Sequence, residues 1–338
     1  MKQAMLWEPK GDDKVRCYLC NHHCLIKPSK KGICGVRENR DGVLHTLVYG
    51  KAIAKHVDPI EKKPLYHFFP GSFSYSIATV GCNFRCLFCQ NADISQMPRD
   101  HERIIGGDFS AHEVVEEAKR THCKTIAYTY TEPTIFFEYA YDTSLLASEA
   151  GLKNLFITNG YMTKDALEAI HPHLHAANVD LKAFNDEYYK RTCGARLQPV
   201  LDSIKIMRKL DIWVEITTLL IPSLNDSKEE LKDLAQFILD VGPEVPWHIS
   251  RFYPTYRLTD IPPTPVQSIH KAREIGLSVG LRYVYSGNVP GDEGENTFCY
   301  HCGHLLIQRL GYTIANNEII DSKCPKCGTT IDGVAMSS

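Results

Sequence analysis

The 338-residue sequence lacks three features: long apolar runs, an excess of charge of one sign, and an apolar N-terminal core. No run of 18 apolar residues occurs, so the sequence predicts no membrane span. Thirty-eight basic and 40 acidic residues leave a net charge of −2, which argues against a nucleic-acid or membrane partner. The first eight residues have no signal-peptide core, so we expect a cytoplasmic protein whose thiols stay reduced.

Cysteine, in contrast, is abundant, and 11 of the 13 cysteines fall into three groups with the spacing of metal ligands. Only Cys123 and Cys193 stand alone; we expect Cys123 beside a helix and Cys193 near the active face. The three groups are Cys17, Cys20, Cys24 and Cys34; Cys82, Cys86 and Cys89; and Cys299, Cys302, Cys324 and Cys327.

The central group has the spacing C-x3-C-x2-C in one tight loop. Thiolates are soft ligands that suit iron–sulfur clusters and zinc. Because cubane clusters normally take four cysteines, three thiols predict a cluster with one iron left open for chemistry. The alternative is a zinc site completed by a histidine from elsewhere in the chain.

This central motif resembles that of the radical S-adenosylmethionine (radical SAM) enzymes, C-x3-C-x-aromatic-C, with Phe88 as the aromatic residue. Gln90-Asn91 resembles the tail of the motif in enzymes that activate glycyl-radical proteins. The resemblance implies a [4Fe-4S] cluster on Cys82, Cys86 and Cys89, whose open iron binds the amino and carboxylate groups of SAM. It also implies an oxidoreductase in which an electron from the cluster cleaves SAM to a 5′-deoxyadenosyl radical.

The pattern of apolar segments divides the chain into three expected parts: a cysteine-rich segment (1–71), a core of alternating strands and helices (72–290) and a four-cysteine module (291–338). We expect an extended loop over 58–71. The expected strands are 43–49, 76–80, 125–129, 154–158, 177–181, 212–217, 247–250 and 281–285. The expected helices are 111–122 (with Ser110 as N-cap), 134–149, 164–170, 198–210, 227–241 and 264–275.

Six or seven strand–helix units in series predict an α/β fold, a parallel sheet curved into a partial (β/α)6-type barrel. Parallel barrels carry their active sites at the carboxyl ends of their strands. Cys82 follows the first core strand almost directly, so we expect the central motif on that face.

Polar side chains close the other core strands and could hold SAM, which needs a carboxylate, a cation and hydrogen-bonding groups. A competing interpretation is that these groups pair with one another or play structural roles. The candidates are Glu132, Asn159, Asp180, Lys182, Glu215, Thr217, His248 and Arg251.

In radical SAM enzymes the second strand ends in Gly-Gly-Glu, which holds the SAM amino group; here Tyr130-Thr131 replaces the glycines and Glu132 remains. The resemblance assigns further cofactor contacts. In glycyl-radical activating enzymes an acidic residue precedes Thr-Asn-Gly, and Ile157 in that place argues against a monovalent cation site. The implied contacts are Phe88, Asn91, Glu132, Asn159, Asp180, Lys182, His248 and Arg251.

The C-terminal group forms two C-x2-C knuckles around a hairpin pattern. This is typical of a zinc ribbon, and the Cys-Pro-x-Cys-Gly form also resembles rubredoxin, which binds iron. The N-terminal group is less regular. It fits either a second iron–sulfur cluster or a zinc knuckle, and the spacing leaves both open.

Three motifs together resemble the radical SAM proteins of the AmmeMemoRadiSam system, relatives of pyruvate formate-lyase activating enzyme. They are the N-terminal cysteine block with Gly-Ile-Cys-Gly-Val-Arg-Glu-Asn, the Thr-Glu-Pro-Thr strand end, and the C-terminal ribbon. The resemblance implies hydrogen abstraction from a protein or peptide, and an electron donor such as flavodoxin or ferredoxin. It also makes the two companion proteins of that system candidate partners. The alternative is a metal-binding adaptor or redox module in which the barrel is only a scaffold.

Overall fold

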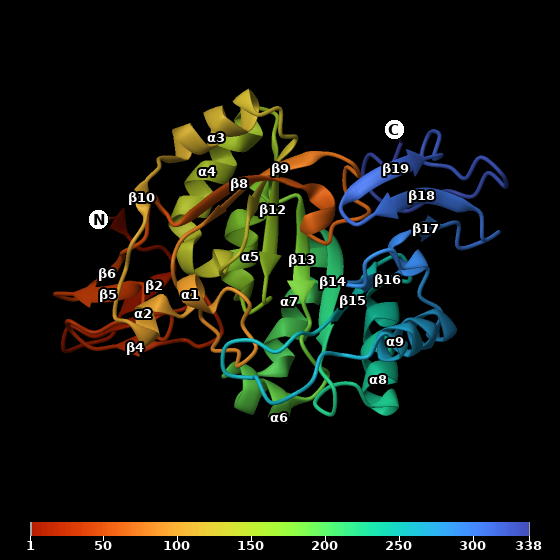
Figure 1. The fold of residues 1–338 in the computed structure, drawn as a ribbon. Helices are drawn as coiled ribbons and strands as arrows, with labels where there is room; N and C mark the ends of the chain where they lie inside the picture. Colours follow the sequence, from red (N-terminus) through yellow and green to blue (C-terminus); the bar gives the residue numbers. More distant parts are fainter. Residues whose placement is uncertain (1, 338) are drawn as a thin grey trace.

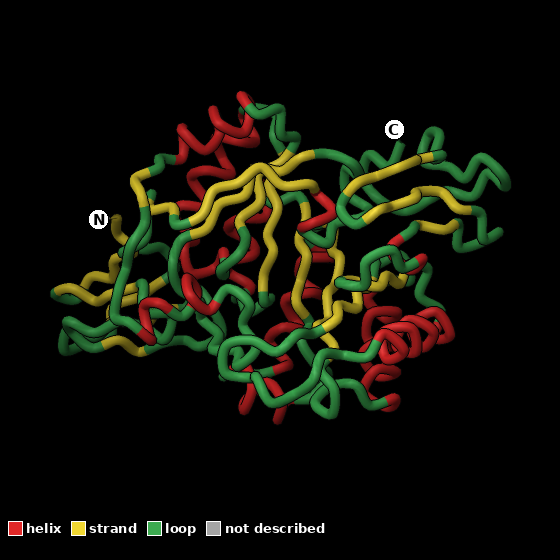
Figure 2. Tube along the Cα trace, viewed as in Figure 1, coloured by secondary structure: helices red, strands yellow, loops and turns green. Residues whose placement is uncertain are grey.

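The computed structural model describes residues 2–337, and a curved eight-stranded sheet forms its centre (Figures 1 and 2). Seven strands are parallel and one edge strand is antiparallel, which confirms the predicted α/β sheet. The sheet is open, because its order begins and ends with different strands. In sheet order the strands are β16 (Val284–Gly287), β15 (Trp247–Arg251), β14 (Trp213–Leu220), β13 (Ala176–Asp180), β12 (Lys153–Thr158), β11 (Thr125–Tyr128), β9 (Phe73–Ala78) and β8 (Ala54–Pro59).

Helices connect the successive parallel strands, as parallel pairing requires. Three of them begin where the sequence predicts, because Ser110, Thr163 and Ser227 each accept a backbone N–H of the first turn. The long helices are α3 (Ala111–Arg120), α4 (Phe137–Glu149), α5 (Lys164–Ile170), α7 (Leu197–Lys209), α8 (Lys228–Val241) and α9 (Val266–Val279). Short helices are α1 (Ala92–Ser95), α2 (Met97–Asp100), α6 (Asp186–Tyr188) and a π-helix (Tyr189–Cys193).

The prediction of an extended loop over 58–71 is wrong at its beginning. β8 runs antiparallel along β9 and a 3-10 helix, Ile60–Lys62, follows it. Lys55, His56 and Asp58 interrupt the apolar pattern of β8, as is common at the edge of a sheet. Ile60, Leu65 and Phe68 then pack against β11, β12 and β13, in one cluster with Ala127, Leu155 and Ala176.

The cysteine-rich N-terminal segment forms two small sheets beside the start of the core (Figure 1). It packs tightly there: a Cβ on Gly81, in the loop after β9, would lie 2.8 Å from Val36 Cγ1. The two sheets are β1 (Lys2–Gln3), β6 (Val43–Thr46) and β5 (Arg37–Arg40), and β2 (Trp7–Pro9), β3 (Val15–Cys17) and β4 (Leu25–Ile26). A further pair joins β7 (Lys51–Ala52) to β10 (Gly107–Asp108).

The C-terminal module is a three-stranded antiparallel sheet at the far end of the core sheet (Figure 1). Its strands are β17 (Thr297–Phe298), β18 (Leu305–Leu310) and β19 (Thr313–Asn317). Arg309 donates to the Tyr66 carbonyl, and Val334 forms a backbone bridge to Phe68. The module therefore contacts the segment after β8. No helix of residues 2–337 is long and apolar enough to cross a membrane.

Candidate active site

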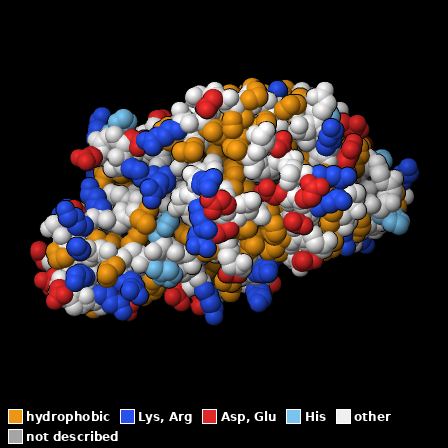
Figure 3. All heavy atoms as spheres, turned by 90° about the horizontal axis from the view of Figure 1, so that it is seen from below, with side chains coloured by type: hydrophobic (Ala, Val, Ile, Leu, Met, Phe, Trp, Pro, Cys, Tyr) orange, Lys and Arg blue, Asp and Glu red, His pale blue; other side chains and the backbone are white. Residues whose placement is uncertain are grey.

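The three-cysteine motif occupies the loop after β9, at the carboxyl ends of the parallel strands. Figure 3 shows the molecule from that side, with hydrophobic side chains gathered in the middle and basic ones over the N-terminal segment. Cys86 is buried, while Cys82 and Cys89 are partly exposed. The backbone N–H of Phe84 donates to Cys82 Sγ at 3.3 Å, and Ser95 Oγ lies 3.1 Å from Cys89 Sγ.

The thiols of the motif are not gathered as closely as the ligands of a single ion. Among residues 2–337, only the C-terminal cysteines form a group whose ligand atoms all lie within 4.8 Å of one another. The thiols of Cys82, Cys86 and Cys89 are therefore spread more widely than the ligands of a single ion. Each cysteine of a cubane cluster binds a different iron, which needs that wider spacing.

Cys193 and Lys182 lie beside Cys86. A hydrogen bond from the Cys193 thiol lowers the pKa of Cys86, and the backbone of the π-helix binds the motif loop, Arg85 N–H donating to Cys193 O at 2.9 Å. Burial acts to lower the pKa of Lys182, but the charges of Asp180 and Cys86 outweigh it and raise the pKa. A partly buried cation therefore faces the thiolates, whose cluster would be anionic. The prediction of Cys193 near the active face is confirmed.

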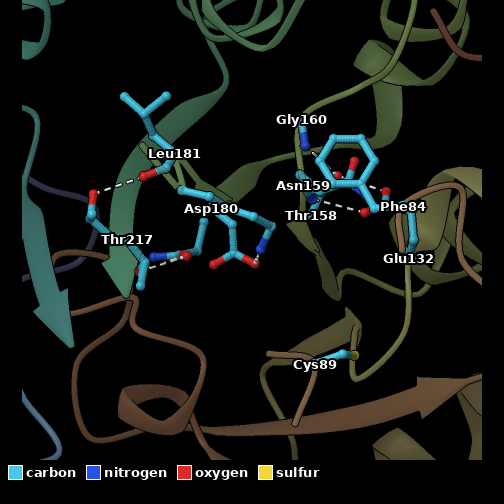
Figure 4. Close-up of polar contacts among 12 residues, drawn as sticks. Phe84, Cys89, Glu132, Thr158, Asn159, Gly160, Asp180, Leu181 and Thr217 are labelled. Atoms are coloured by element: carbon cyan, nitrogen blue, oxygen red, sulfur yellow. Dashed lines mark hydrogen bonds and ion pairs between the residues drawn. The ribbon is translucent and has the colours of Figure 1, made fainter. Parts of the chain in front are cut away.

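Glu132, just after β11, is 2% exposed, and all its hydrogen-bond donors are neutral. Thr134 N–H donates at 3.0 Å, Thr158 Oγ1 at 2.7 Å and Asn159 N–H at 2.8 Å, and the Thr134 hydroxyl donates as well. Burial raises the pKa of Glu132. Figure 4 shows Glu132 with Thr158 and Asn159, and Asp180 at the end of the neighbouring strand.

Asn159 connects this carboxylate to the cysteine motif. Its side-chain amide donates to Asn83 Oδ1 at 2.8 Å and lies 3.8 Å from Cys82 Sγ. Asp180 lies one strand away and accepts from Lys182 Nζ at 2.9 Å. Glu132, Asn159, Asp180 and Lys182 are thus on the face of the motif, as expected for residues at strand ends.

Tyr130 occupies the place of the first glycine in the Gly-Gly-Glu pattern, and its φ of 60° is one that glycine adopts most easily. The tyrosine hydroxyl donates to Asp58 of β8, which fixes the side chain in this backbone conformation. The Tyr130 carbonyl accepts from Asn91 Nδ2 at 2.7 Å, so Asn91 joins the motif loop to the end of β11. Phe88 is buried, with Lys182 Nζ 5.7 Å from its ring centroid.

A loop over residues 252–265 crosses the face that carries the motif. Arg257 N–H donates to Leu87 O at 2.9 Å, and Tyr256 Oη donates to Asp100 at 2.6 Å. Arg251 lies at the carboxyl end of β15, but its guanidinium donates to Thr264 O and Tyr253 Oη within this loop. In this structure Arg251 therefore holds the loop.

The prediction that Glu215 and His248 lie with the other strand-end residues is wrong. β14 extends to Leu220, so Glu215 lies near its beginning and binds His248 Nε2 at 2.7 Å inside the barrel. The Glu215 carboxylate also accepts the backbone N–H groups of Tyr66 and His67, in the segment that covers the amino ends of the strands. His248 therefore belongs to a buried structural cluster.

That buried cluster predicts a pH-dependent stability. Burial lowers the pKa of His67 from 6.5 to about 4, and its two ring nitrogens bind Tyr285 Oη and Asp332 O. Between these pH values the unfolded chain binds a proton that the folded chain does not, so stability rises with pH. We expect His67 to contribute a loss of about 2 kcal/mol in unfolding free energy from pH 7 to pH 5.

Urea unfolding followed by circular dichroism at both pH values measures this loss. Other histidines contribute to the total, including His175, whose pKa burial also lowers to about 4. The His67→Gln variant isolates the share of His67: its loss should be smaller than that of the wild type. Equal losses in the two proteins would show that His67 titrates normally.

The four C-terminal cysteines are arranged for a single metal ion. Cys299 Sγ lies 3.7 Å from Cys327 Sγ, and Cys302 Sγ lies 3.8 Å from Cys324 Sγ. A tetrahedral ion with metal–sulfur bonds of about 2.3 Å separates its ligands by about 3.8 Å. The group could therefore hold a metal, and both zinc and iron accept four thiolates.

Replacing Cys302 and Cys327 together by serine should remove about one metal ion per chain. Binding of a structural metal contributes about 10–16 kcal/mol to the folding of small modules, so we expect proteases to cleave within residues 291–338. Elemental analysis and mass spectrometry of tryptic fragments measure both effects. Cys123→Ser, a buried cysteine outside the three groups, is the control. An unchanged metal content in the double variant would contradict the assignment.

Comparison with known proteins agrees with this site. A family model described as the radical SAM superfamily matches residues 76–238, from β9 into α8. The uncharacterized protein MJ0808 of Methanocaldococcus jannaschii is 48% identical over 335 residues, which cover 98% of this chain and 99% of that protein. The pyruvate formate-lyase-activating enzyme of Clostridium pasteurianum is 26% identical over 167 residues, 48% of this chain and 67% of that enzyme.

Among solved structures, a radical SAM methyltransferase from Sphaerobacter thermophilus superposes with a TM-score of 0.51 at 15% identity, over 68% of this chain and 71% of that one. This likeness supports the fold alone. The matched family model includes the cysteine motif, the Glu132 strand end and the Asp180 strand end. Residues 76–238, just under half of the chain, thus match the radical SAM superfamily, and along nearly its whole length the protein belongs to one family with MJ0808.

Proposed function

We propose that the protein cleaves SAM reductively and abstracts a hydrogen atom from a protein or peptide. The cluster on Cys82, Cys86 and Cys89, when bound, supplies the electron that converts SAM to a 5′-deoxyadenosyl radical. The chain's own residues bind and orient SAM: we assign Glu132 to its ammonium group, and Phe88, Asn91, Asn159, Asp180, Lys182 and Arg251 to the other cofactor contacts.

The observation that carries the proposal is the buried Glu132 carboxylate beside the thiols. A buried carboxylate without a cation is costly, and its four neutral donors stabilise but do not neutralise it. A ligand ammonium would supply the missing charge. Asn159, which contacts both Glu132 and Cys82, would then hold the ligand's binding group at the edge of the cluster.

The substrate class rests on the relatives. The C. pasteurianum relative is named as an activating enzyme of pyruvate formate-lyase, and another relative from M. jannaschii as a putative glycyl-radical enzyme activating enzyme. Glycyl-radical activation, or another modification of a protein or peptide, is the reaction we propose. The motif resemblance makes the companion proteins of the AmmeMemoRadiSam system the first candidate substrates, and flavodoxin or ferredoxin the electron donor.

The first test is anaerobic reconstitution with iron and sulfide, reduction with dithionite, and chromatographic assay of 5′-deoxyadenosine from added SAM. The substrate class is tested by adding fractions of cells that make the protein natively. Stimulation by a macromolecular fraction, lost after protease treatment, supports a protein substrate. Stimulation by the small-molecule fraction alone would reject it. An intact, reduced cluster that gives no product with any fraction would favour the scaffold alternative.

A further inference from the structure

A cavity outside the proposed active site is lined by all four N-terminal cysteines. The space around it that atoms do not fill is about 340 Å³, open solvent included. Its other walls are mostly apolar, with Leu19, Ile26, Ile33 and Ile135 among them. We propose that this cavity holds a second [4Fe-4S] cluster bound by Cys17, Cys20, Cys24 and Cys34.

The four N-terminal thiols are not gathered as closely as the ligands of a single ion. The C-terminal cysteines have ligand atoms within 4.8 Å of one another, and among residues 2–337 no other group of three or more potential ligands does. The N-terminal thiols therefore surround the cavity at a wider spacing than one ion requires. In a cubane cluster each thiolate binds a separate iron, so the four sulfurs lie farther apart.

Two residues that line the cavity each carry a buried hydrogen-bond donor without a partner. Arg37 Nε and Asn83 Nδ2 are both buried and unpaired among the described residues, and the two side chains are only 1% exposed. Unpaired buried donors are costly. A zinc ion offers them no acceptor beyond its thiolates, whereas a cubane cluster also presents its inorganic sulfides. Arg37 Nη1 already donates to Cys17 Sγ at 2.9 Å.

The cavity directly adjoins the active-site motif. His22 Nε2 lies 2.8 Å from Asn83 O, and a Cβ on Gly81 would lie 3.3 Å from Cys34 O. Asn83 lines the cavity and also follows Cys82 in the chain, so one residue touches both sites. The N-terminal cysteine group and the active-site motif are therefore neighbours in the fold.

The site would therefore act as an electron entry point. A one-electron donor of the flavodoxin or ferredoxin class would reduce the N-terminal cluster by one electron, and the cluster would return to its oxidised state on passing that electron toward the motif. This role rests on the proposed function, but occupancy of the site does not.

The test uses the full chain with Cys82, Cys86 and Cys89 all replaced by alanine, reconstituted anaerobically. We expect about four iron atoms and about four acid-labile sulfides per chain, against about eight sulfides in the wild type. Replacing Cys20 and Cys34 by alanine in addition should remove the sulfide. The C-terminal site does not affect this count, because four thiolates around one ion include no sulfide.

Sulfide-free protein with an additional zinc ion in the triple variant would overturn the proposal. If the triple variant fails to fold, electron paramagnetic resonance of the reduced wild type decides instead. Two cluster signals, of which SAM changes only one, support the proposal, and a single SAM-responsive signal rejects it. If the wild type cleaves SAM but contains one cluster, only the second site is rejected. If the triple variant binds a cluster but the wild type does not cleave SAM, only the proposed function is rejected.

Discussion

Replacing Cys86 by alanine is expected to reduce 5′-deoxyadenosine formation to background. Cys86 is the buried central thiol of the motif, adjacent to Cys193 and Lys182. Without it the cluster loses one of its three protein ligands while the metal groups at either end of the chain are untouched. Chromatography of anaerobic reactions measures the product, and iron, sulfide and zinc are counted on the same samples.

Cys123→Ala is the matched control, because Cys123 is also buried but lies after α3, where its thiol contacts Thr121. It should keep the wild-type rate within a small factor. Product formation by the Cys86 variant at the wild-type rate would mean that the cluster is bound elsewhere. The N-terminal and the C-terminal cysteine groups would then be the remaining candidates for binding the cluster.

Replacing Glu132 by glutamine should weaken SAM binding by about 100-fold or more. Removing one partner of a buried charge pair costs about 3–5 kcal/mol, because the other charge is left uncompensated. Glutamine keeps the size of the side chain and one oxygen that can accept from Thr134 and Thr158. Only the Asn159 N–H, which donates to the other carboxylate oxygen, loses its acceptor, so the surrounding fold should survive. Equilibrium dialysis of SAM against the oxidised, reconstituted protein measures affinity without turnover.

The pH dependence of this affinity gives a second, independent readout. Burial raises the pKa of Glu132, and an ammonium ligand requires the ionised form. Wild-type affinity should therefore rise as the pH increases above 4.5, the ordinary pKa of a glutamate, while the Glu132→Gln affinity stays level. Glu230→Gln, which alters a carboxylate that accepts the Phe184 N–H, is the control. Unchanged SAM affinity in the Glu132 variant would remove this residue from the binding site.

The sequence predicted the parallel core well because apolar strands and capped helices are local signals. Ser110 and Ser227 mark helix starts within a few residues of sequence. The motif loop was equally local, since its three cysteines lie in one stretch of eight residues. Glu132 and Asp180 followed from the rule that strand ends share one face.

The errors arose where pairing between distant segments decides the structure. The apolar pattern predicts that β14 ends at Thr217, but the strand runs to Leu220; Pro222, which cannot continue a central strand, is the signal in the sequence. Glu215 therefore lies near the beginning of β14 and not at its carboxyl end. Likewise, the contact of Cys193 with Cys86 depends on a π-helix that no simple periodicity predicts.

The roles of Arg37 and Asn83 could not be predicted at all. Arg37 lies in a cysteine-rich segment full of basic residues, and nothing in the sequence separates it from solvent-exposed neighbours such as Arg40. Only the packing of the N-terminal sheets against the motif loop buries it beside Cys17. Asn83 is likewise an ordinary loop residue until the fold places it between two cysteine groups.

The contact between Arg309 and Tyr66 has a thermodynamic consequence. Arg309 is 2% exposed and its guanidinium lies 4.1 Å from the Tyr66 ring centroid, while Tyr66 packs against His248 of the core sheet. Separating the C-terminal module from the core sheet would remove the packing partner of both the Arg309 guanidinium and the Tyr66 ring. The last 48 residues and the sheet should therefore melt in a single calorimetric transition, and a variant that loses the C-terminal metal should lower the melting temperature of the whole chain.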